Sequence, residues 1–302
     1  MNPNKEIEQG MQLAARKPDL TPDAISERLR PIYEDIQQSL RVPLVNQIFR
    51  TLANYPDYLE PVWQELSPYF RAEAFEEQAD AIRKTAIPEE IPDVSGLDLD
   101  KLRETKKLKD FNDTIYYVLP KLLLVTSLFY ELSYGKKQQI GLKNNKDNDF
   151  SKISVGILEG MAKVQMVDPE KASVRVNQIF DSIKEVHNFP LIPSYYRGVA
   201  DWPDFLEKTW NPIKPLVGSA AYEKRKQKLV EQTNLALKNL PLPIKQKHLI
   251  SDKDKNEEIR LILFAFKQKF IPEMLLDMAL IEAMLYGKEA TSYSRFSATT
   301  NR

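Results

Sequence analysis

The pattern of apolar and polar positions along this chain predicts helices throughout. Each half closes with a long apolar run, over residues 115–132 in the first half and 264–285 in the second. Other helices are expected at about residues 46–53, 72–84, 194–200 and 220–238, and after the prolines at 56 and 203. The valine-rich alternation of strands is missing, so the pattern predicts an all-α fold.

The chain contains an internal repeat. Residues 42–68 recur in register as residues 189–215, at an offset of 147, and ten of the 27 aligned positions are identical. A second stretch aligns residues 120–136 with 272–288, at an offset of 152. A tandem duplication of two related helical halves explains both matches. We expect the halves to pack as a pseudo-two-fold dimer, with a pocket on the axis lined by equivalent positions.

The domain boundaries follow from this repeat. We expect a first helical repeat over residues 1–140, a polar linker over 141–152 and a second helical repeat over 153–302. Thr21-Pro22-Asp23 aligns with Asp168-Pro169-Glu170, and each triplet has a capping oxygen, a proline and an acid, so each predicts a helix start. Further linkers are expected at residues 87–96 and around Pro241, a mobile connection at 136–152, and a frayed tail from Thr291.

Composition narrows the function classes. The chain has 43 basic and 43 acidic residues, so neither nucleic acid nor an anionic membrane surface is an expected partner. It has no cysteine, which excludes disulfides, thiol catalysis and thiolate metal sites. We expect no metal and no cofactor, and the polar N-terminus favours a cytoplasmic location. Lys121 and Glu131 interrupt the first apolar run, which predicts a buried bundle helix rather than a membrane span.

Several recurring residues are predicted to be structural. Asp204 follows a helix-starting proline, where a carboxylate complements the helix dipole. Asp201 is a plausible cap of the same helix, which leaves it only a minor catalytic candidate. Trp63 and Trp210 recur at one helical position and are predicted core anchors. His187 occupies the position of a leucine in the first copy, which favours a packing or helix-end role.

Two recurring arginines could have either a structural or a substrate-binding role. Arg50 and Arg197 occupy equivalent positions in the two copies. Each guanidinium could pair with a buried acid or bind the carboxylate of a substrate. The ion pair is the favoured interpretation, because many perturbed charges in proteins belong to structural pairs.

The two copies differ most at one segment. Asn46-Gln47-Ile48-Phe49 in the first copy faces Pro193-Ser194-Tyr195-Tyr196 in the second. Tyr195 and Tyr196 could stack on a ligand or donate a hydrogen bond, whereas the isoleucine and phenylalanine can only pack. A phenol is a weak base at neutral pH, so Tyr195 is a better orienting group than an activator of water.

The segments V-P-L-V-N-Q-I-F-R, Y-P-D-Y-L-E-P-V-W and S-Y-Y-R-G-V-A-D-W-P carry a resemblance that covers about residues 20–290. The chain resembles the group I 2-haloacid dehalogenases, a non-stereospecific, all-helical family of two tandem copies that is related in fold to the alkylhydroperoxidase-like helical superfamily. The resemblance implies a cofactor-independent hydrolysis. An aspartate activates a water, which attacks the halogen-bearing carbon directly and inverts it.

The resemblance also implies the site residues. Tyr195 occupies the position of the family's catalytic aspartate, and Ser194 and Tyr195 are expected to orient water. Asp201, Glu76 and Glu77 are the candidates that could replace the base. The implied substrate-binding residues are Leu44, Gln47, Arg50, Leu119, Leu122, Tyr196, Arg197, Ile271 and Leu275.

Two functions are compatible with these observations. The first is hydrolysis of a small 2-halo carboxylic acid by direct water attack with inversion, with the base replaced. The alternative is a non-catalytic or repurposed protein that binds a small carboxylic acid or an apolar ligand on the same scaffold. A homodimer is compatible with both. A carboxylate within reach of a water beside Tyr195 would favour the enzyme, and an entirely apolar, closed cavity would count against hydrolysis.

Overall fold

The computed structural model describes residues 2–94, 96–135, 153–240 and 248–297, and this part of the chain is all-α, without a strand. The predicted fold class is therefore confirmed. The helices of the first half, in chain order, are α1 (Pro3–Arg16), α2 (Arg30–Leu40), α3 (Gln47–Leu52), α4 (Pro56–Phe70), α5 (Glu73–Thr85) and α6 (Thr105–Tyr134). Those of the second half are α7 (Val174–His187), α8 (Ser194–Val199), α9 (Pro203–Ile213), α10 (Ala220–Asn239), α11 (Lys253–Ala265) and α12 (Ile271–Tyr286).

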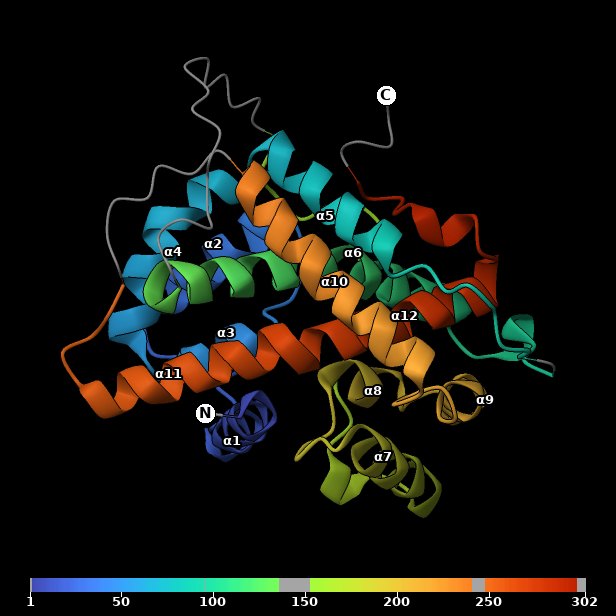
Figure 1. The fold of residues 1–302 in the computed structure, drawn as a ribbon. Coiled ribbons are helices and arrows are strands. Elements are labelled where there is room, and N and C mark those ends of the chain that lie inside the picture. Colours follow the sequence, from blue (N-terminus) through green and yellow to red (C-terminus); the bar gives the residue numbers. More distant parts are fainter. Residues whose placement is uncertain (1, 95, 136–152, 241–247, 298–302) are drawn as a thin grey trace.

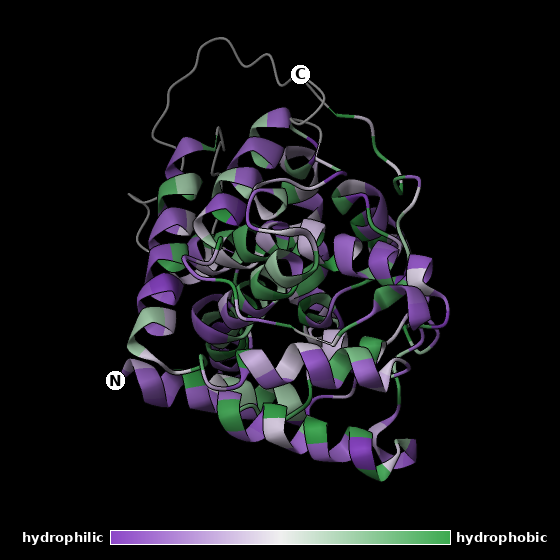
Figure 2. Cartoon of the chain, turned by 90° about the vertical axis from the view of Figure 1, so that its right-hand side faces the viewer, coloured by the Kyte–Doolittle hydropathy of each residue, from purple (hydrophilic) through white to green (hydrophobic). Residues whose placement is uncertain are grey.

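The two long apolar runs form the centre of the bundle. α6 packs against α12, and a π-helical turn, η4 (Phe266–Phe270), joins α11 to α12 into one rod (Figure 1). By length and composition α6 could cross a membrane, but 94% of its most apolar window is buried inside the fold, as in the core helix of a soluble protein. Figure 2 shows hydrophobic residues gathered on the inner helices and hydrophilic ones on the outer helices.

The first helix of the chain belongs spatially to the second half. α1 packs against α11 and lies below it in Figure 1. Gly10 makes this approach possible, because a side chain there would collide with the backbone carbonyl of Leu261. The contact ties the N-terminal segment to the opposite repeat and so brings the residues after α1 near the second half.

The residues that recur in the repeat hold equivalent positions. Trp63 and Trp210 are both 1% exposed, as predicted for core anchors. Their indole nitrogens donate to Asp35 at 2.8 Å and to Ser182 at 3.1 Å, and these two partners are themselves equivalent positions. Both tryptophans thus hold their own helix to an earlier helix of the same half through a polar contact at aligned positions.

The two predicted helix starts upstream of the repeat block are wrong. Thr21 lies in a turn, and α2 starts only at Arg30. Asp168 caps no more than a 3-10 turn, Pro169–Lys171, and α7 begins at Val174. The capping oxygen of α7 comes from Ser173, whose hydroxyl accepts from the backbone N–H of Val176 at 3.3 Å.

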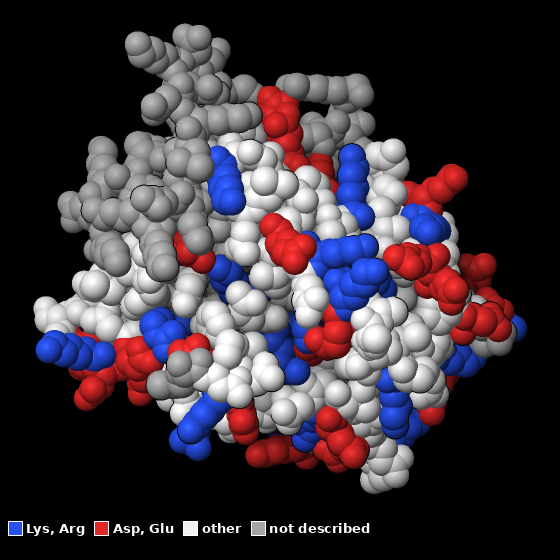
Figure 3. Space-filling view, viewed as in Figure 1, with Lys and Arg blue, Asp and Glu red and all other residues white. Residues whose placement is uncertain are grey.

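Some predicted connections cannot be compared with the structure. The polar connection at residues 136–152, the segment 241–247 and residues 298–302 lie outside the described residues. The expectation of a frayed tail from Thr291 is wrong for residues 291–297, because Thr291, Phe296 and Ser297 are buried against the fold. Residues 87–94 are irregular, as expected of a linker. On the face shown in Figure 3, basic and acidic side chains are interspersed, which fits the zero net charge.

Candidate active site

A small cavity, which we call the inner cavity, lies where the two halves meet. Its volume is about 60 Å³. The starts of α3 and α8, the middle of α6, and η4 with the start of α12 form its wall. The lining residues are Asn46, Gln47, Ile48, Ile115, Leu119, Leu122, Pro193, Ser194, Tyr195, Phe266, Phe270, Ile271 and Met274. The wall is mostly apolar, and no acid is among these described residues.

Most of the wall consists of positions that the repeat relates. The pairs are Asn46 with Pro193, Gln47 with Ser194, Ile48 with Tyr195, Leu119 with Ile271, and Leu122 with Met274. Aligned positions of the two halves therefore both line the cavity, but they carry different side chains. The first half contributes two amides, and the second contributes a hydroxyl and a phenol.

The structure brings together six of the residues that were expected in the site, which are Gln47, Leu119, Leu122, Ser194, Tyr195 and Ile271. Two others, Leu44 and Leu275, do not line the cavity. Leu275 is fully buried in the core, and its neighbour Met274 faces the cavity instead. Successive helical residues point about 100° apart, so an alignment wrong by one residue exchanges a wall position for a core position.

Two more expected site residues lie outside the cavity. Tyr196 is buried and donates a hydrogen bond of 2.6 Å to Asp277, away from the lining. Asp201 is exposed in the turn before α9 and does not line the inner cavity. Its carboxylate does not cap that helix either, whose N-cap residue is Trp202.

A larger cavity, which we call the outer cavity, adjoins the inner one. It has a volume of about 300 Å³ and shares Gln47 and Ser194 with the inner cavity. Both recurring arginines, Arg50 and Arg197, line it, and among the described residues Asp19 is the only acid in its wall. The two cavities thus form a polar outer chamber and an apolar inner one that meet at an amide and a hydroxyl.

Arg50 is held by an extensive set of contacts. It is 4% exposed, and its Nε lies 2.5 Å from the carboxylate of Asp19. Nη1 donates to the carbonyl of Val45 at 2.7 Å, and Nη2 donates to the hydroxyl of Ser194 at 3.0 Å. The favoured interpretation as a structural ion pair agrees with these contacts. Arg50 also links the two halves, because Ser194 belongs to the second.

Arg197 is in a different electrostatic state. Its Nε donates to the carbonyl of Val167 at 3.0 Å, and no carboxylate of the described residues lies within 4.0 Å of it. This difference from Arg50 corresponds to one position in the sequence. The offset of 147 pairs Asp19, the acid that contacts Arg50, with Met166, which has no charge. Within the described part of the chain no carboxylate neutralises the guanidinium of Arg197, which is partly buried in the wall of the outer cavity.

Tyr195 is positioned as a neutral phenol. It is 4% exposed, its ring stacks on Phe111 with centroids 6.1 Å apart, and its hydroxyl donates to Asn112 at 3.1 Å. Burial, together with nearby acids such as Glu282, raises the pKa of Tyr195 well above its usual 10. The phenol therefore does not ionise near neutral pH.

The inner cavity also contains polar atoms without partners. The side-chain oxygens of Asn46 and Gln47 are buried and accept no hydrogen bond from the described part of the chain. Since buried polar atoms are normally satisfied, these amides are available to a water or a ligand. They come from the first half and line the same cavity as Ser194 and Tyr195 of the second.

A buried network of charges lies behind α8. The ring of His187, 1% exposed, lies between two carboxylates, with Nδ1 2.9 Å from Glu273 and Nε2 2.9 Å from Asp277. Burial alone would lower the pKa of His187, but the charges of Asp277 and Glu273 outweigh it and raise the pKa to about 9. Asp277 also accepts from Tyr196 and Tyr222, so the network anchors the residue that follows Tyr195.

The alternative acids proposed from the sequence are occupied or distant. Glu76 is buried and forms an ion pair with Lys121 and a hydrogen bond of 2.8 Å with Tyr117. Glu77 is exposed on α5. Neither of these acids, nor Asp201, lines the inner or the outer cavity.

Three features of the site were not predicted from the sequence: Asp19, Asn112 and the role of Asp277. Asp19 precedes the repeat block, so the alignment offered no reason to single it out. The one available signal was the contrast between an acid at 19 and Met166 at the equivalent place. For Asp277, a charge within an apolar helix could have indicated a buried partner such as His187.

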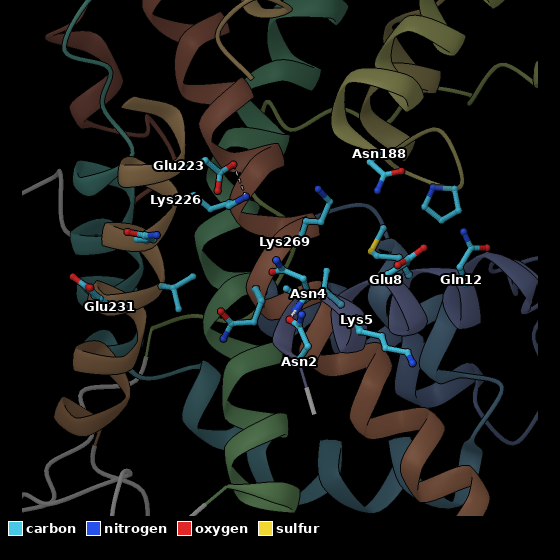
Figure 4. A pocket seen from close by; sticks show the side chains of 16 residues that line it. Asn2, Asn4, Lys5, Glu8, Gln12, Asn188, Glu223, Lys226, Glu231 and Lys269 are labelled. Atoms are coloured by element: carbon cyan, nitrogen blue, oxygen red, sulfur yellow. Dashed lines mark hydrogen bonds and ion pairs between the residues drawn. The ribbon is translucent and has the colours of Figure 1, made fainter. Parts of the chain in front are cut away.

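A third and larger hollow is a groove that shares only Pro190 with the outer cavity. Its volume is about 920 Å³, and Figure 4 shows side chains of both charges around it, including Lys226 paired with Glu223. It contains none of the predicted site residues. Among the described residues, no group of three or more acids or histidines could hold a metal ion.

Curated relatives cover much or nearly all of the chain. A configuration-inverting 2-haloacid dehalogenase from Alcaligenes xylosoxydans xylosoxydans is 27% identical over 295 residues, which is 92% of this chain and 97% of that protein. Another configuration-inverting 2-haloacid dehalogenase, from Pseudomonas sp. (strain 113), is 29% identical over 66% of this chain and 67% of its own length. An (R)-2-haloacid dehalogenase from Pseudomonas putida is 24% identical over 223 residues, or 71% of this chain and 73% of that one.

Solved structures share the fold. A D-2-haloacid dehalogenase in complex with L-LA superposes with a TM-score of 0.77 at 20% identity. A mutant of a D-2-haloacid dehalogenase in complex with D-2-CPA gives a TM-score of 0.76 at 19% identity. Each comparison covers 88% of this chain and 95% of the other.

These matches correct the family assignment. The expectation of the non-stereospecific group I family is wrong, because the relatives are configuration-inverting or (R)-specific and the matching structures are D-2-haloacid dehalogenases. The family model that matches is described as halocarboxylic acid dehydrogenase DehI, and it covers residues 43–196, just over half of the chain. The protein belongs to the halocarboxylic acid dehydrogenase DehI family.

Proposed function

We propose that this protein hydrolyses a small 2-halocarboxylic acid by direct attack of water on the halogen-bearing carbon, with inversion. Relatives along most of the chain are 2-haloacid dehalogenases, which supports the class of reaction. The observation that carries the proposal is the guanidinium of Arg197, which has no carboxylate partner among the described residues and lies in the wall of the outer cavity, next to an apolar inner cavity. Substrate and water supply every atom of the products.

Arg197 is the residue that we assign to the substrate carboxylate. A guanidinium binds a carboxylate through two parallel hydrogen bonds, which fixes orientation as well as position. Arg50 is unsuited to this role because Asp19 already binds it and its remaining donors face Val45 and Ser194. Of the two arginines that the sequence left open, we therefore choose Arg197.

The inner cavity is assigned to the halogen. A carbon–halogen bond that points past Gln47 and Ser194 places the halogen in the inner cavity, whose wall consists mostly of aliphatic and aromatic groups. The attacking water then occupies the outer cavity, on the opposite side of the reacting carbon. In-line displacement requires this opposite placement, and it inverts the carbon.

Ser194 and Tyr195 are assigned to orienting groups. The hydroxyl of Ser194 accepts from Arg50, so its own proton remains to be donated and it retains capacity to accept from water. Tyr195 donates to Asn112 and can still accept one hydrogen bond. Neither is assigned to removing the proton of water, because a neutral hydroxyl is a poor base at neutral pH.

The arrangement of the halves is part of the proposal. We assign residues 1–140 and 153–302 to two repeats related by a pseudo-two-fold axis that passes near the inner cavity. The five pairs of equivalent positions in its wall support this arrangement. The asymmetry of those pairs gives the substrate one preferred direction.

A second candidate function is binding without turnover. It is favoured by the lack of an acid among the described residues of the inner cavity, together with Tyr195 at the family's base position. The two functions predict different results with the same compounds. A binding protein retains 2-chloropropionate unchanged, whereas the proposed enzyme converts it to lactate and chloride.

The test is release of halide from D- and L-2-chloropropionate, with chiral analysis of the lactate that forms. We expect chloride and lactate of inverted configuration, and we expect Arg197→Gln to raise KM at least tenfold. Arg175→Gln is the matched control, because Arg175 is half-exposed on α7 in a surface ion pair with Asp204. Binding of the acid without chloride release would support the second candidate. If the protein neither binds the acid nor releases chloride, both candidate functions are contradicted.

A further inference from the structure

We propose that Asp19, supplied by the loop after α1, is the general base that activates the attacking water in the outer cavity. This inference rests on the proposed hydrolysis and names the proton acceptor that the proposal leaves unassigned. It concerns a residue of the first half, whereas the position occupied by Tyr195 lies in the second half. The base would thus come from the opposite copy.

The location of Asp19 is the first argument. Among the described residues that line the inner and outer cavities, Asp19 is the only one with a carboxylate. Its side chain is 44% exposed, so water reaches it from the outer cavity. Arg197, the proposed anchor of the substrate, lines the same cavity.

The second argument is the contact with Arg50. Nη2 of Arg50 lies 3.0 Å from the hydroxyl of Ser194 and 3.5 Å from Oδ2 of Asp19. The carboxylate and the hydroxyl therefore flank one guanidinium nitrogen, and a water in front of that nitrogen lies within reach of both. The water would donate one proton to Asp19 while Ser194 holds its orientation.

The third argument is that the loop is held in place. The hydroxyl of Tyr33 donates to the carbonyl of Leu20 at 2.7 Å, and the amide of Asn54 donates to the carbonyl of Pro18 at 3.1 Å. These bonds fix the residues on both sides of Asp19, and Arg50 fixes the carboxylate itself. A base on a loop that is clamped at three points keeps the geometry that proton transfer needs.

The chemistry balances with the groups named. Asp19 takes a proton from water, the water oxygen forms a bond to the carbon that carries the halogen, and the bond to the halogen breaks with both electrons on the halide. The halide departs through the inner cavity. Asp19 then releases its proton to solvent, and the products are a 2-hydroxy acid, a halide and one proton.

Other acids of this region do not line either cavity. Glu273 and Asp277 face His187, and Glu76 faces Lys121, whereas Asp19 lies in the wall of the outer cavity. Glu282 is buried, and burial, with the negative charge of Asp113, raises the pKa of Glu282 well above its usual range. A carboxyl that remains protonated cannot accept a proton from water.

The experiment measures halide release by the unaltered protein and by Asp19→Asn, Asp19→Ala and Asp23→Asn. Asp23 is an exposed acid of the same segment that lines neither cavity, so Asp23→Asn is the matched control. We expect kcat to fall by about a hundredfold to ten-thousandfold in both Asp19 variants, and to remain within about twofold in the control. We expect formate to restore part of the rate of Asp19→Ala, since a small carboxylate can occupy the vacated space.

A purely structural role of Asp19 predicts a different result. Loss of the ion pair with Arg50 would lower thermal stability, but formate would not restore the turnover of Asp19→Ala. Retention of the rate in both Asp19 variants, or a slow Asp19→Ala variant without rescue, overturns the inference while the proposed hydrolysis stands. Absence of halide release from the unaltered protein overturns the proposed function itself, and the assignment of Asp19 with it.

Discussion

The guanidinium of Arg50 donates a hydrogen bond of 3.0 Å to the hydroxyl of Ser194, so a residue of the first half fixes a residue of the second at the junction of two cavities. Arg197, its counterpart in the repeat, makes no equivalent contact with an acid among the described residues. Arg50 is therefore engaged on several sides within the fold, whereas Arg197 has only the carbonyl of Val167 as a hydrogen-bond partner among the described residues.

The first prediction concerns the contrast between these two arginines. Arg50→Gln removes the ion pair with Asp19 and the hydrogen bonds to Val45 and Ser194, so it should lower the free energy of unfolding by about 2 to 3 kcal/mol. Arg197→Gln should cost at most about 1 kcal/mol, because it loses a single hydrogen bond to a carbonyl. Urea titrations of both variants measure this difference, and equal losses would contradict it.

The second prediction concerns Tyr195. If the phenol orients water and does not remove its proton, Tyr195→Phe should reduce kcat by no more than about tenfold and stability by about 1 kcal/mol, through loss of the bond to Asn112. Steady-state kinetics and thermal unfolding measure the two effects. A loss of a thousandfold or more would indicate that the hydroxyl takes part in proton transfer.

The third prediction concerns pH and His187. The pKa of His187 is about 9 in the folded protein and about 6.5 in an unfolded chain, so the folded state binds more protons between these values. The stabilisation from this group is fully present below about pH 6.5 and is lost as the pH rises through 9. Its size is on the order of 3 kcal/mol. Unfolding free energies measured from pH 6 to 10 should show this decline.

A variant separates this effect from other titrations. His187→Leu introduces the residue found at the equivalent position, Leu40, and leaves Glu273 and Asp277 without the imidazolium between them. It should be destabilised by about 3 kcal/mol at pH 7 and should lack most of the decline above pH 7. A variant that shows the same decline as the unaltered protein would refute the role of His187.

The fourth prediction concerns the inner cavity. Leu122→Ala enlarges the cavity in which the halogen is placed. The kcat/KM for iodoacetate, divided by that for chloroacetate, should therefore rise severalfold. Leu123→Ala is the control, because Leu123 is equally buried but does not line the cavity. Both variants should lose about 2 to 5 kcal/mol of stability. A ratio that does not differ between the two variants would place the halogen elsewhere.

The sequence predicted the parts of the structure that follow from local pattern and repetition. The long apolar helices, and lining positions such as Gln47 and Ser194, followed from the period of the helix and from the offset between copies. The start of α7 was wrong because two capping signals, Asp168 and Ser173, lie close together. Only packing selects which of them begins a regular helix.

The parts that could not be predicted depend on long-range partners. Asp19 meets Arg50 across 31 residues, and His187 meets Glu273 across 86, and neither spacing is visible as a pattern. Hydropathy also treats every charged residue as a surface residue. The burial of Asp277 between His187 and two tyrosines therefore becomes evident only when the helices are assembled.

The most direct test of the central claim is a single turnover of excess protein with D-2-chloropropionate in water enriched in oxygen-18, followed by chiral separation and mass spectrometry of the lactate. Direct attack by water with inversion predicts L-lactate that carries one heavy oxygen at the hydroxyl in the first turnover. Unlabelled L-lactate would indicate an oxygen taken from the protein through a covalent ester. D-lactate, or no lactate at all, would contradict the proposed reaction.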